Sequence, residues 1–555
     1  MSKLRIVPLG GTSHVTKNFF VYEYWFDNGK VERLIVDCGI GFPEEEMMGV
    51  DLILPDISYL KGKEDTILGI VLTHGHDDHI GGLPYLLPKL GKIPLYASPL
   101  TAGLIKNKFK EFKLNNEINV LNDSVLQKIG SFEFEFICMT HSIPDTKHII
   151  IRTPIGNFYH GADFKLDFTP VDGKKPDLQR IALAGKEGIL CMLSDCLRVE
   201  KEGFTPSETL LEDTFEREIR SCQGKFIVTT MSSNIHRIQQ AVNVAARHKR
   251  KVAFFGRSIE SNTKVAQELG FFKMPPGVYA TKRQSNKIPP KDICLIVAGS
   301  QGQEDSALVR IANDAHLQVK ITPGDKVVFS VDPIPGNENA FYRTIDKLSQ
   351  LGAIVSYSDI LDDLHVSGHA SAGELKIVLS LVKPKYVMPI GGNFRHMNHF
   401  RNLAASIGFD KKNVLILKEG QIISFDNSGN IHYEEILDLK TVVVDGLGVG
   451  DVGRIVLSDR KQMSKEGIVV VAIPVKKGTN QIISDPEIIS RGFVFMRDSN
   501  ELIRQAKKII NDKIPSENKI ADWQKLKVSI EKELKKFFFN ETAREPIILP
   551  VIVKV

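Results

Sequence analysis

Short apolar runs separated by turn residues fill the first third of the chain. Runs of this length, bounded by Gly, Pro, Asn or Asp, are typical of β-strands. We interpret five of them as strands, at residues 4–9, 19–26, 34–37, 53–57 and 67–72. Two longer segments, 83–90 and 101–112, have apolar positions at helical spacing. The opening portion therefore predicts a mixed β and α core.

After residue 197 the pattern changes to a longer alternation of strands and helices. Strands are expected at 225–230, 251–256 and 292–298, with amphipathic helices between them at 236–248 and 261–269. This βαβα rhythm predicts a parallel sheet with helices on its faces.

The remaining segments predict a hairpin and then a smaller body. Residues 414–418 and 421–425 are two short strand-like runs with a turn between them, which is typical of a hairpin. Past residue 438 we expect strands at 468–475, 492–496 and 546–555 and helices at 501–511 and 520–538. This last part is interpreted as a separate small α+β domain.

Five residues able to bind a metal ion follow the apolar run that ends at Leu72; they are His74, His76, Asp77, Asp78 and His79. Alternate side chains of an extended segment share a side, so His74 and His76 can face one ion. Asp78 and His79, past the bend, can reach a second ion. An ordinary surface loop does not explain this spacing directly after a buried strand, and the motif predicts a metal site.

Three further metal-capable residues, His141, Asp163 and Asp195, each follow a predicted strand. Taken singly, His141 is an ordinary loop residue and Asp163 a turn or cap. A metal pair needs ligands that converge from several strand ends. Together with the first motif, His141 and Asp163 are therefore predicted to be ligands.

Two loops have the small polar residues of a phosphate site. Residues 365–371, His-Val-Ser-Gly-His-Ala-Ser, lie between a strand and a predicted helix at 372–381. The N-terminus of a helix offers an anion backbone amides and a favourable dipole, which predicts that a terminal phosphate binds there. Residues 229–234 have similar surroundings. The alternative for residues 365–371 is two core histidines and a helix cap, and for 229–234 it is capping of the helix by Ser and Asn.

Composition sets outer limits on these interpretations. The 555 residues are too many for one ordinary core, and a net charge of +5 permits a polyanionic partner without requiring one. The six cysteines include no C-x-x-C pair, which predicts reduced thiols and a cytoplasmic location. The start has no leader pattern and no apolar stretch has membrane-spanning length, so we expect neither secretion nor a membrane partner.

Read in order, these motifs resemble ribonuclease J, a β-CASP branch of the metallo-β-lactamase superfamily. The matching segments are His74–Gly82, His141-Ser-Ile-Pro-Asp, Gly161-Ala-Asp163-Phe-Lys, Ser194-Asp195, Ser233–Gln240, Gly299-Ser-Gln-Gly302, Pro333-Ile-Pro-Gly-Asn337 and His365–Ser371. Because they stand in the family's order, the resemblance is specific, and it covers nearly the whole chain.

The resemblance implies an α/β and α+β fold in which a metallo-β-lactamase αββα sandwich is split by an inserted β-CASP domain. A small C-terminal α+β domain would follow. The expected boundaries are 1–197 for the first part of the core, 198–352 for the β-CASP domain, 353–430 for the second part, 431–460 for a linker and 461–555 for the C-terminal domain.

The resemblance also implies two divalent metal ions, expected to be zinc, with manganese or magnesium as alternatives. The first ion would bind His74, His76, His141 and Asp163, and the second Asp78, His79 and the same Asp163. The catalytic residues would be Asp78, Asp195 and His369. The RNA would contact Ser233, Asn234, Ile235, His365, Val366, Ser367, Gly368, His369 and Ala370.

The chain departs from the family where Gly391 and Asn393 stand in place of a His and a Glu. One ligand of the second metal is therefore missing. We predict a second site that is retained but weaker, with His396 as a candidate substitute ligand.

Two other departures concern the neighbourhood of the site. His14-Val15-Thr16 replaces the family's Glu-Ile-Gly, and we expect His14 to be an ordinary loop residue rather than a ligand. Cys196-Leu197 replaces the small hydroxyl residues that follow Asp195, which alters the contacts around the ligands.

The activity that the resemblance implies is hydrolysis of single-stranded RNA, preferably 5′-monophosphorylated, in RNA maturation and decay. Cleavage would proceed from 5′ to 3′ and also internally. A metal-bound hydroxide would attack phosphorus and leave 5′-phosphate and 3′-hydroxyl ends. The expected assembly is a homodimer or homotetramer.

Three alternatives remain open at this stage. The chain could be a catalytically weakened RNA-binding paralogue that supports an active partner subunit. A small-molecule hydrolase such as a lactonase would explain the metal loop but not residues 367–371. A DNA nuclease is less favoured because the match is to the RNA branch.

Overall fold

The computed structural model describes residues 2–44, 46–334, 337–446, 448–450, 453–479, 481–493, 500–514 and 522–555. Positions 335–336 of the segment Pro333–Asn337 and positions 494–496 of the predicted strand 492–496 lie outside the described residues. Contacts divide the chain into two compact units, which are Met1–Phe42 with Leu52–Val442, and Pro43–Asp51 with Val443–Val555.

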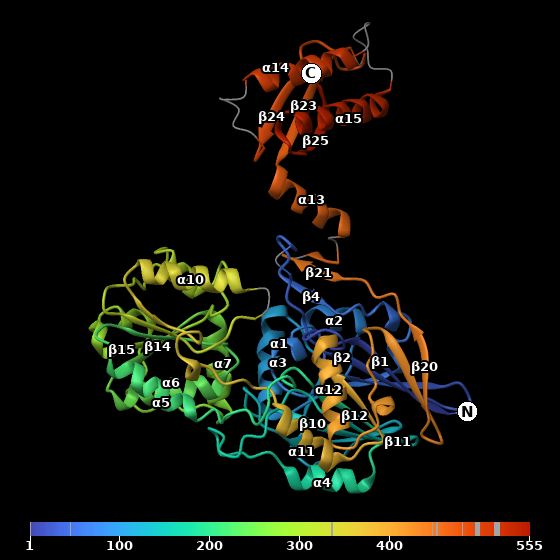
Figure 1. Ribbon diagram of the computed structural model, residues 1–555, viewed down its shortest axis with the longest axis vertical. Coiled ribbons are helices and arrows are strands. Elements are labelled where there is room, and N and C mark those ends of the chain that lie inside the picture. The colour runs from blue at the N-terminus through green and yellow to red at the C-terminus, as the bar shows by residue number, and fades with distance from the viewer. Residues whose placement is uncertain are drawn as a thin grey trace. The chain divides into compact units, whose positions relative to one another are not determined.

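Two β-sheets packed face to face form the core of the first unit (Figure 1). Their strand orders are β20-β19-β1-β2-β3-β5-β6-β7 and β18-β12-β11-β10-β9-β8. Because side chains alternate across a strand, one set from each sheet fills the layer between them. Phe20 and Tyr22 of the first sheet share this buried cluster with Phe134 and Phe158 of the second.

The strands of the first sheet are β1 (Lys3–Gly10), β2 (Phe19–Trp25), β3 (Val31–Val36), β5 (Ile67–Leu72), β6 (Leu95–Ala97), β7 (Ile118–Val120), β19 (Gln421–Asp426) and β20 (Ile431–Ile436). Those of the second are β8 (Gln127–Ile129), β9 (Phe132–Cys138), β10 (Lys147–Thr153), β11 (Gly156–His160), β12 (Cys191–Asp195) and β18 (Tyr386–Ile390). The short strand β4 is Leu52–Leu54.

Helices cover the outer faces of both sheets. On the first sheet, α2 (Leu83–Leu90) packs on α3 (Pro99–Phe112), which contacts β6 and β7. On the second, apolar residues of α4 (Leu178–Glu187), α11 (Ala372–Val382) and α12 (Phe394–Ser406) form a separate buried cluster with the outward side chains of the strands. The predicted αββα sandwich is therefore confirmed.

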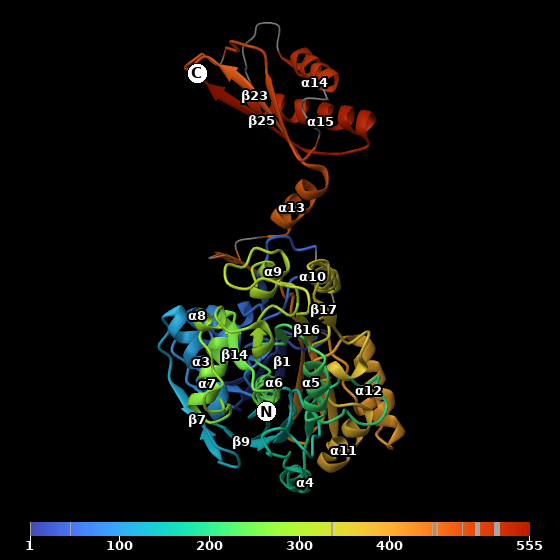
Figure 2. The same ribbon diagram turned by 90° about the vertical axis from the view of Figure 1, so that its left-hand side faces the viewer.

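The inserted segment forms a body of its own, coloured green to yellow in Figures 1 and 2. Its sheet has the order β14-β15-β13-β16-β17, and each neighbouring pair is parallel, as the βαβα rhythm predicts. The strands are β13 (Phe226–Thr229), β14 (Lys251–Phe255), β15 (Ile293–Val297), β16 (Lys326–Phe329) and β17 (Ile354–Ser356). The helices are α5 (Leu210–Arg220), α6 (Ile235–Arg247), α7 (Arg257–Glu268), α8 (Lys282–Ser285), α9 (Ala307–Ala312) and α10 (Glu338–Gln350).

The hairpin predicted at 414–418 and 421–425 is wrong. β19 pairs instead with β1 and with β20, which follows it in the chain. Val414 makes only an isolated bridge to Val387. The run around Leu415 and Leu417 is apolar because these side chains fill the layer between the sheets without joining a strand ladder.

The second unit is a small α+β body. β23 (Ile468–Val475) pairs antiparallel with β24 (Glu487–Arg491) and parallel with β25 (Ile547–Lys554). One face of this sheet is buried together with apolar residues of α14 (Asn500–Lys513) and α15 (Trp523–Thr542). The unit also contains α13 (Arg454–Glu466) and the short strand β22 (Gly448–Val449); β21 (Val442–Asp445) lies almost wholly within it. The predicted C-terminal α+β domain is thereby confirmed.

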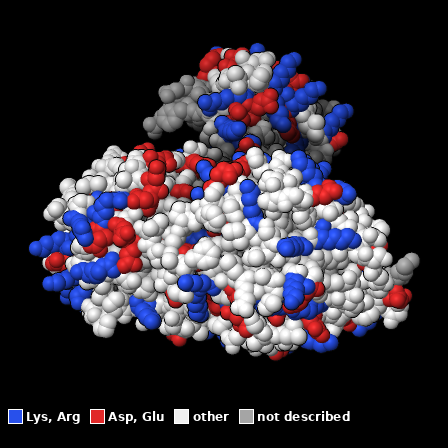
Figure 3. All heavy atoms as spheres, turned by 60° about the horizontal axis from the view of Figure 1, so that its bottom comes forward, with Lys and Arg blue, Asp and Glu red and all other residues white. Residues whose placement is uncertain are grey.

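The surface shown in Figure 3 carries both signs of charge. Blue and red side chains gather together toward the left, over the inserted domain, and much of the centre is uncharged. A polyanion would therefore meet local groups of cations on this face. No helix in the described part of the chain has the length and apolar character needed to span a bilayer.

Candidate metal centre

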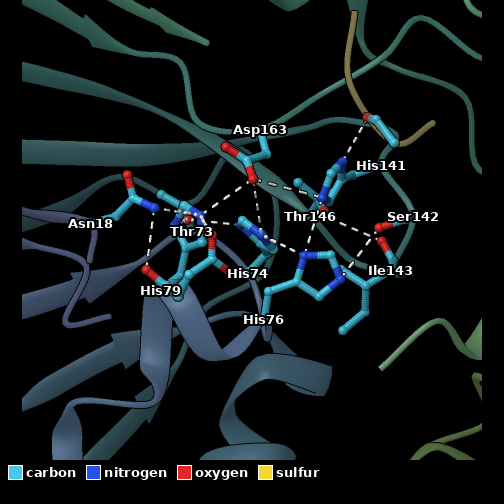
Figure 4. Close-up of polar contacts among 12 residues, drawn as sticks. Asn18, Thr73, His74, His76, His79, His141, Ser142, Ile143, Thr146 and Asp163 are labelled. Atoms are coloured by element: carbon cyan, nitrogen blue, oxygen red, sulfur yellow. Dashed lines mark hydrogen bonds and ion pairs between the residues drawn. The ribbon is translucent and has the colours of Figure 1, made fainter. Parts of the chain in front are cut away.

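Loops at the ends of three core strands bring the predicted ligands together. Two follow β5, two lie in the short helix α1 (Asp77–Ile80), one follows β9 and one follows β11. They are His74 and His76, Asp78 and His79, His141, and Asp163. Figure 4 shows His74, His76, His141 and Asp163 pointing toward one another.

The first group of potential ligands is His74, His76, His141 and Asp163. His76 Nδ1 lies 3.1 Å from His74 Nε2 and 3.2 Å from His141 Nε2. Asp163 Oδ2 lies 3.9 Å from each of those Nε2 atoms. A tetrahedron with metal bonds of about 2.0–2.1 Å has edges of roughly 3.3 Å. These four atoms are therefore spaced to surround one ion.

The second group is Asp78, His79 and Asp163. His79 Nε2 lies 3.4 Å from Asp163 Oδ2 and 3.6 Å from Asp78 Oδ2. Its other ring nitrogen, Nδ1, donates to Asp37 at 2.7 Å, and Asp37 also accepts from the Thr73 hydroxyl and backbone amide. A carboxylate on the far nitrogen fixes the tautomer and leaves Nε2 as the ligand atom.

Burial keeps the imidazoles of the first group uncharged. It lowers the pKa of His76 to about 4. Burial, reinforced by the neighbouring imidazoles, also lowers the pKa of His74 and His141 well below the usual range. Burial raises the pKa of Asp78 to about 6. Metal ligands must be deprotonated, so neutral imidazoles around a carboxylate fit a divalent cation.

Asp163 also belongs to a third group, with Asp195 at the end of β12 and His369. Asp195 Oδ2 accepts from His369 Nδ1 at 2.8 Å, and His369 Nε2 lies 4.0 Å from Asp163 Oδ2. Burial alone would lower the pKa of His369, but the carboxylates of Asp195 and Asp163 outweigh it and raise the pKa to about 9. The two carboxylates therefore favour the protonated form of the ring, and Asp195 holds it through Nδ1.

The loop 365–371 touches the metal site directly. His141 Nδ1 donates to the carbonyl of Gly368 at 2.7 Å, which leaves His141 Nε2 directed at the other ligands. A side chain at Gly368 would collide with this ring, since a Cβ there would lie 2.6 Å from His141 Cε1. The position of one ligand and the position of the loop are therefore linked.

The start of α11 does not offer the free amides that the sequence suggested. The amides of Ala372 and Gly373 donate to the carbonyls of Lys201 and Gly203, each at 2.8 Å. The Ser371 amide donates to Glu374, whose capping box closes the turn. These donors are occupied by the protein, so an anion at this loop would need other partners.

Residues Ser233, Asn234 and Ile235 form the start of α6 in the inserted domain, where Asn234 caps the helix by accepting from the Arg237 amide. The Arg237 side chain reaches from this helix to the loop 365–371. Its guanidinium donates to the Val366 carbonyl at 2.9 Å and lies 3.0 Å from His365 Nδ1. The two predicted RNA-binding segments are thus brought side by side by one buried arginine.

Gly391 leaves an opening beside the second group. Its φ of +65° lies in the left-handed region, and a Cβ there would meet only Asp195 Oδ1 at 3.7 Å and Asp163 Oδ1 at 3.8 Å. A side chain at position 391 would therefore extend toward the two carboxylates. Glycine itself offers no side chain that could complete the second group.

The structure does not place His396 as a substitute ligand. His396 Nδ1 accepts from the Asn393 amide at 3.2 Å, within the capping box of α12. Its Nε2 lies 3.1 Å from Arg395 Nε and 3.7 Å from Glu200. Both ring nitrogens are engaged by the helix start, and no group of potential ligands in the described chain contains His396.

His14 lies on an exposed loop, with its ring 3.8 Å from Glu419. Its side chain is 55% exposed, in contrast to the buried ligands. It belongs to no group of potential ligands among the residues described.

Sequence reasoning missed three residues that organise the site, which are Asn18, Asp37 and Arg237. Asp37 follows the buried strand β3, the same signal that pointed to His141 and Asp163. Asn18 Nδ2 lies 3.0 Å from His79 Nε2, and nothing in its surrounding sequence marks it. Arg237 stands inside the quoted segment 233–240, but its burial could not be anticipated.

Comparison with known families agrees with this architecture. The chain matches the models described as Metallo-beta-lactamase superfamily over residues 18–182, Ribonuclease J, beta-CASP domain over 223–348, Zn-dependent metallo-hydrolase RNA specificity domain over 360–417 and Ribonuclease J C-terminal domain over 455–555. The split sandwich and its histidine-rich loop thus define a metallo-β-lactamase superfamily hydrolase with a β-CASP insertion.

Similar proteins extend the match to the full length. The chain is 38% identical to Ribonuclease J 1 of Streptococcus pyogenes, covering 100% of this chain and 98% of that protein. It is 36% identical to Ribonuclease J2 of Bacillus subtilis, covering 100% of this chain and 99% of that protein. The chain belongs to the ribonuclease J family.

A solved structure supports the fold alone. A protein of unknown function from Enterococcus faecalis V583 superposes with a TM-score of 0.53 at 14% identity, covering 76% of this chain and 100% of that one. The family and the ligand groups together define the function: the chain is a hydrolytic ribonuclease that binds RNA and depends on divalent metal.

We expect Asp37→Asn to weaken binding of the second metal ion by roughly 10- to 100-fold, because the charge behind His79 is removed while the shape is kept. Titration of metal-free protein against a chelating dye measures this affinity. Asp65→Asn, at an exposed position of similar chemistry, is the matched control and should leave both affinities unchanged. Equal affinities in Asp37→Asn and wild type would contradict the role of Asp37.

Proposed function

We propose that the chain degrades single-stranded RNA from the 5′ end toward the 3′ end, with additional internal cleavage, and that it prefers a 5′ monophosphate. The observation that carries this proposal is the bond between His141 Nδ1 and the Gly368 carbonyl. It ties a candidate ligand to the loop proposed to hold the terminal phosphate. A chain end docked there would present its first phosphodiester to the metal centre, and an undocked strand would be cut internally.

The two ligand groups support a binding position for each of two metal ions. Three imidazole nitrogens and a carboxylate oxygen at tetrahedral spacing fit zinc, and we propose zinc for the first site. When bound, divalent ions supply a nucleophile by lowering the pKa of water and offset negative charge on phosphoryl oxygens. Asp163 is shared by both groups and would hold the two ions at a fixed separation.

The residues of the chain supply the proton for the leaving group. His369 is the general acid in this proposal, because its raised pKa keeps a proton on Nε2. Asp195 holds the ring through Nδ1 and orients it. Transfer of the proton to the departing 3′ oxygen leaves a 3′-hydroxyl, and the other product carries a 5′ phosphate.

We further propose a cytoplasmic homodimer or homotetramer. The cysteines at 38, 138, 191, 196, 222 and 294 are all free thiols in the structure, which supports a reducing compartment. The assembly follows from the family resemblance and needs a direct measurement of mass in solution.

A second candidate function is favoured by one observation, the open position at Gly391. A second ion held by only Asp78, His79 and Asp163 would be bound weakly, and the chain would then act as an RNA-binding paralogue that supports an active subunit. The two candidates differ in the activity of the purified chain.

Purified wild type should release nucleoside 5′-monophosphates from 5′-monophosphorylated RNA when zinc or manganese is supplied. His76→Ala should lower the rate at least about a hundredfold, because metal stabilisation of the transition state is worth several kcal/mol. The control is His432→Ala, an exposed histidine on β20 that should keep the wild-type rate. An inactive wild type, with RNA binding retained, would favour the supporting-paralogue function.

We expect Gly391→His to raise the affinity for the second metal ion at least about tenfold, because an imidazole there extends toward Asp195 and Asp163. Histidine is among the residues that adopt positive φ more readily than most. Gly391→Ala is the matched control, since it introduces the same backbone strain without a ligand. Calorimetric metal titration should show the gain only in the histidine variant; equal tight binding of two ions in all three proteins would refute the weakened site.

A further inference from the structure

The cationic side chains around loop 365–371 differ in whether a carboxylate already neutralises their charge. Burial is the main cause of the lowered pKa of His365. The positive charges of Arg237, Arg198 and Lys165 lower this pKa further, so all three cations lie near the loop. Arg237 is 1% exposed and is ion-paired with Glu208 at 2.8 Å. Lys165, also 1% exposed, lies between Asp167 at 3.7 Å and Glu208 at 3.6 Å. Both charges are committed to the fold.

Arg198 is the exception. Among the described residues no carboxylate lies within ion-pair distance of it, and its side chain makes one hydrogen bond, from Nε to Ser371 Oγ at 3.3 Å. The side chain is only half-buried, and neither of its terminal nitrogens is among the buried atoms that lack a partner. A guanidinium fork is therefore open to solvent at the edge of the loop.

The backbone holds this arginine in a fixed place. It lies three residues after Asp195, in a turn where the Leu197 amide donates to Asp195 Oδ1 at 2.9 Å. Val199 anchors the same turn in the core of the second sheet. Immediately beyond, the carbonyl of Lys201 accepts from the first amide of α11. Arg198 thus stands between the residue that orients His369 and the end of the phosphate loop.

Donors at the end of the loop are already occupied. The amides of Ser371, Ala372 and Gly373 are occupied by Glu374, Lys201 and Gly203, and the His369 amide donates to the Ser367 hydroxyl. The amides of His365, Val366, Ser367, Gly368 and Ala370 have no hydrogen-bond partner among the residues described. Uncharged amides do not neutralise a phosphate monoester, which carries up to two charges, so a cation is required beside them.

We propose that Arg198 binds the 5′-terminal phosphate of the RNA through its two terminal nitrogens, with the Gly368 and Ala370 amides as the other donors. Arginine suits this task because its planar fork matches two phosphate oxygens at once. Arg198 would then distinguish a terminal monoester from a 5′-hydroxyl end. The assignment rests on the proposed function, since it presumes that a chain end docks in this loop.

The test measures binding of two dinucleotides by calorimetry to the metal-loaded protein. Both have a non-cleavable linkage, and only one has a 5′ phosphate. Arg198→Gln should lower the affinity for the phosphorylated ligand roughly 10- to 100-fold, the range for hydrogen bonds to a charged group, and leave the affinity for the hydroxyl ligand unchanged. The affinity of Arg198→Lys for the phosphorylated ligand should lie between those of wild type and Arg198→Gln, because lysine keeps the charge and loses the planar fork. Arg220→Gln, an exposed arginine on α5, is the control and should match wild type.

The outcomes separate this assignment from the proposed function. Equal affinity of Arg198→Gln and wild type for the phosphorylated dinucleotide would overturn the assignment, as would an equal loss for both ligands accompanied by a lower melting temperature. A wild type that cleaves 5′-phosphate and 5′-hydroxyl RNA at the same rate would contradict the proposed 5′ preference. If wild type shows no such preference but Arg198→Gln still binds the phosphorylated dinucleotide more weakly than wild type does, the assignment stands and the proposed function fails.

Discussion

Desolvation of a tight imidazole and carboxylate cluster is the constraint on which the site depends. Four histidines and two aspartates converge at the ends of β5, β9 and β11, and most of them are nearly inaccessible to solvent. Buried like charges repel and buried unpaired charges are costly. Burial lowers the pKa of the three imidazoles of the first group, whereas Asp37, Asp78 and Asp163 outweigh burial and raise the pKa of His79. A divalent metal ion compensates the carboxylates, and the sandwich provides the rigid strands that hold the ligands still.

Much of this arrangement could be predicted because strand ends have a local signature. His141 and Asp163 follow buried alternating runs. Because β9 and β11 both pair antiparallel with β10 between them, they run in the same direction and the residues after them reach the same edge of the sheet. Asp37 also follows a buried strand, but its role is to orient His79 rather than to bind metal, so a search for metal ligands does not select it. The fold class follows from the same patterns, together with the change in rhythm after residue 197.

What could not be predicted depends on partners that are remote in sequence. The amides at the start of α11 are occupied by carbonyls of Lys201 and Gly203, more than 150 residues away by number, and no local pattern announces this. His396 has a suitable position in the chain, yet its ring is engaged in the capping of α12. The run at 414–418 is apolar because it fills the core, and apolar character alone does not distinguish that from a strand.

Crystals of the zinc-loaded protein, with anomalous difference maps at the zinc edge, test the central claim most directly. The account predicts a peak about 2.0–2.2 Å from His74 Nε2, His76 Nδ1, His141 Nε2 and an oxygen of Asp163, and a weaker peak between Asp163 and His79. A zinc ion bound elsewhere, with these side chains metal-free at saturating zinc, would contradict it.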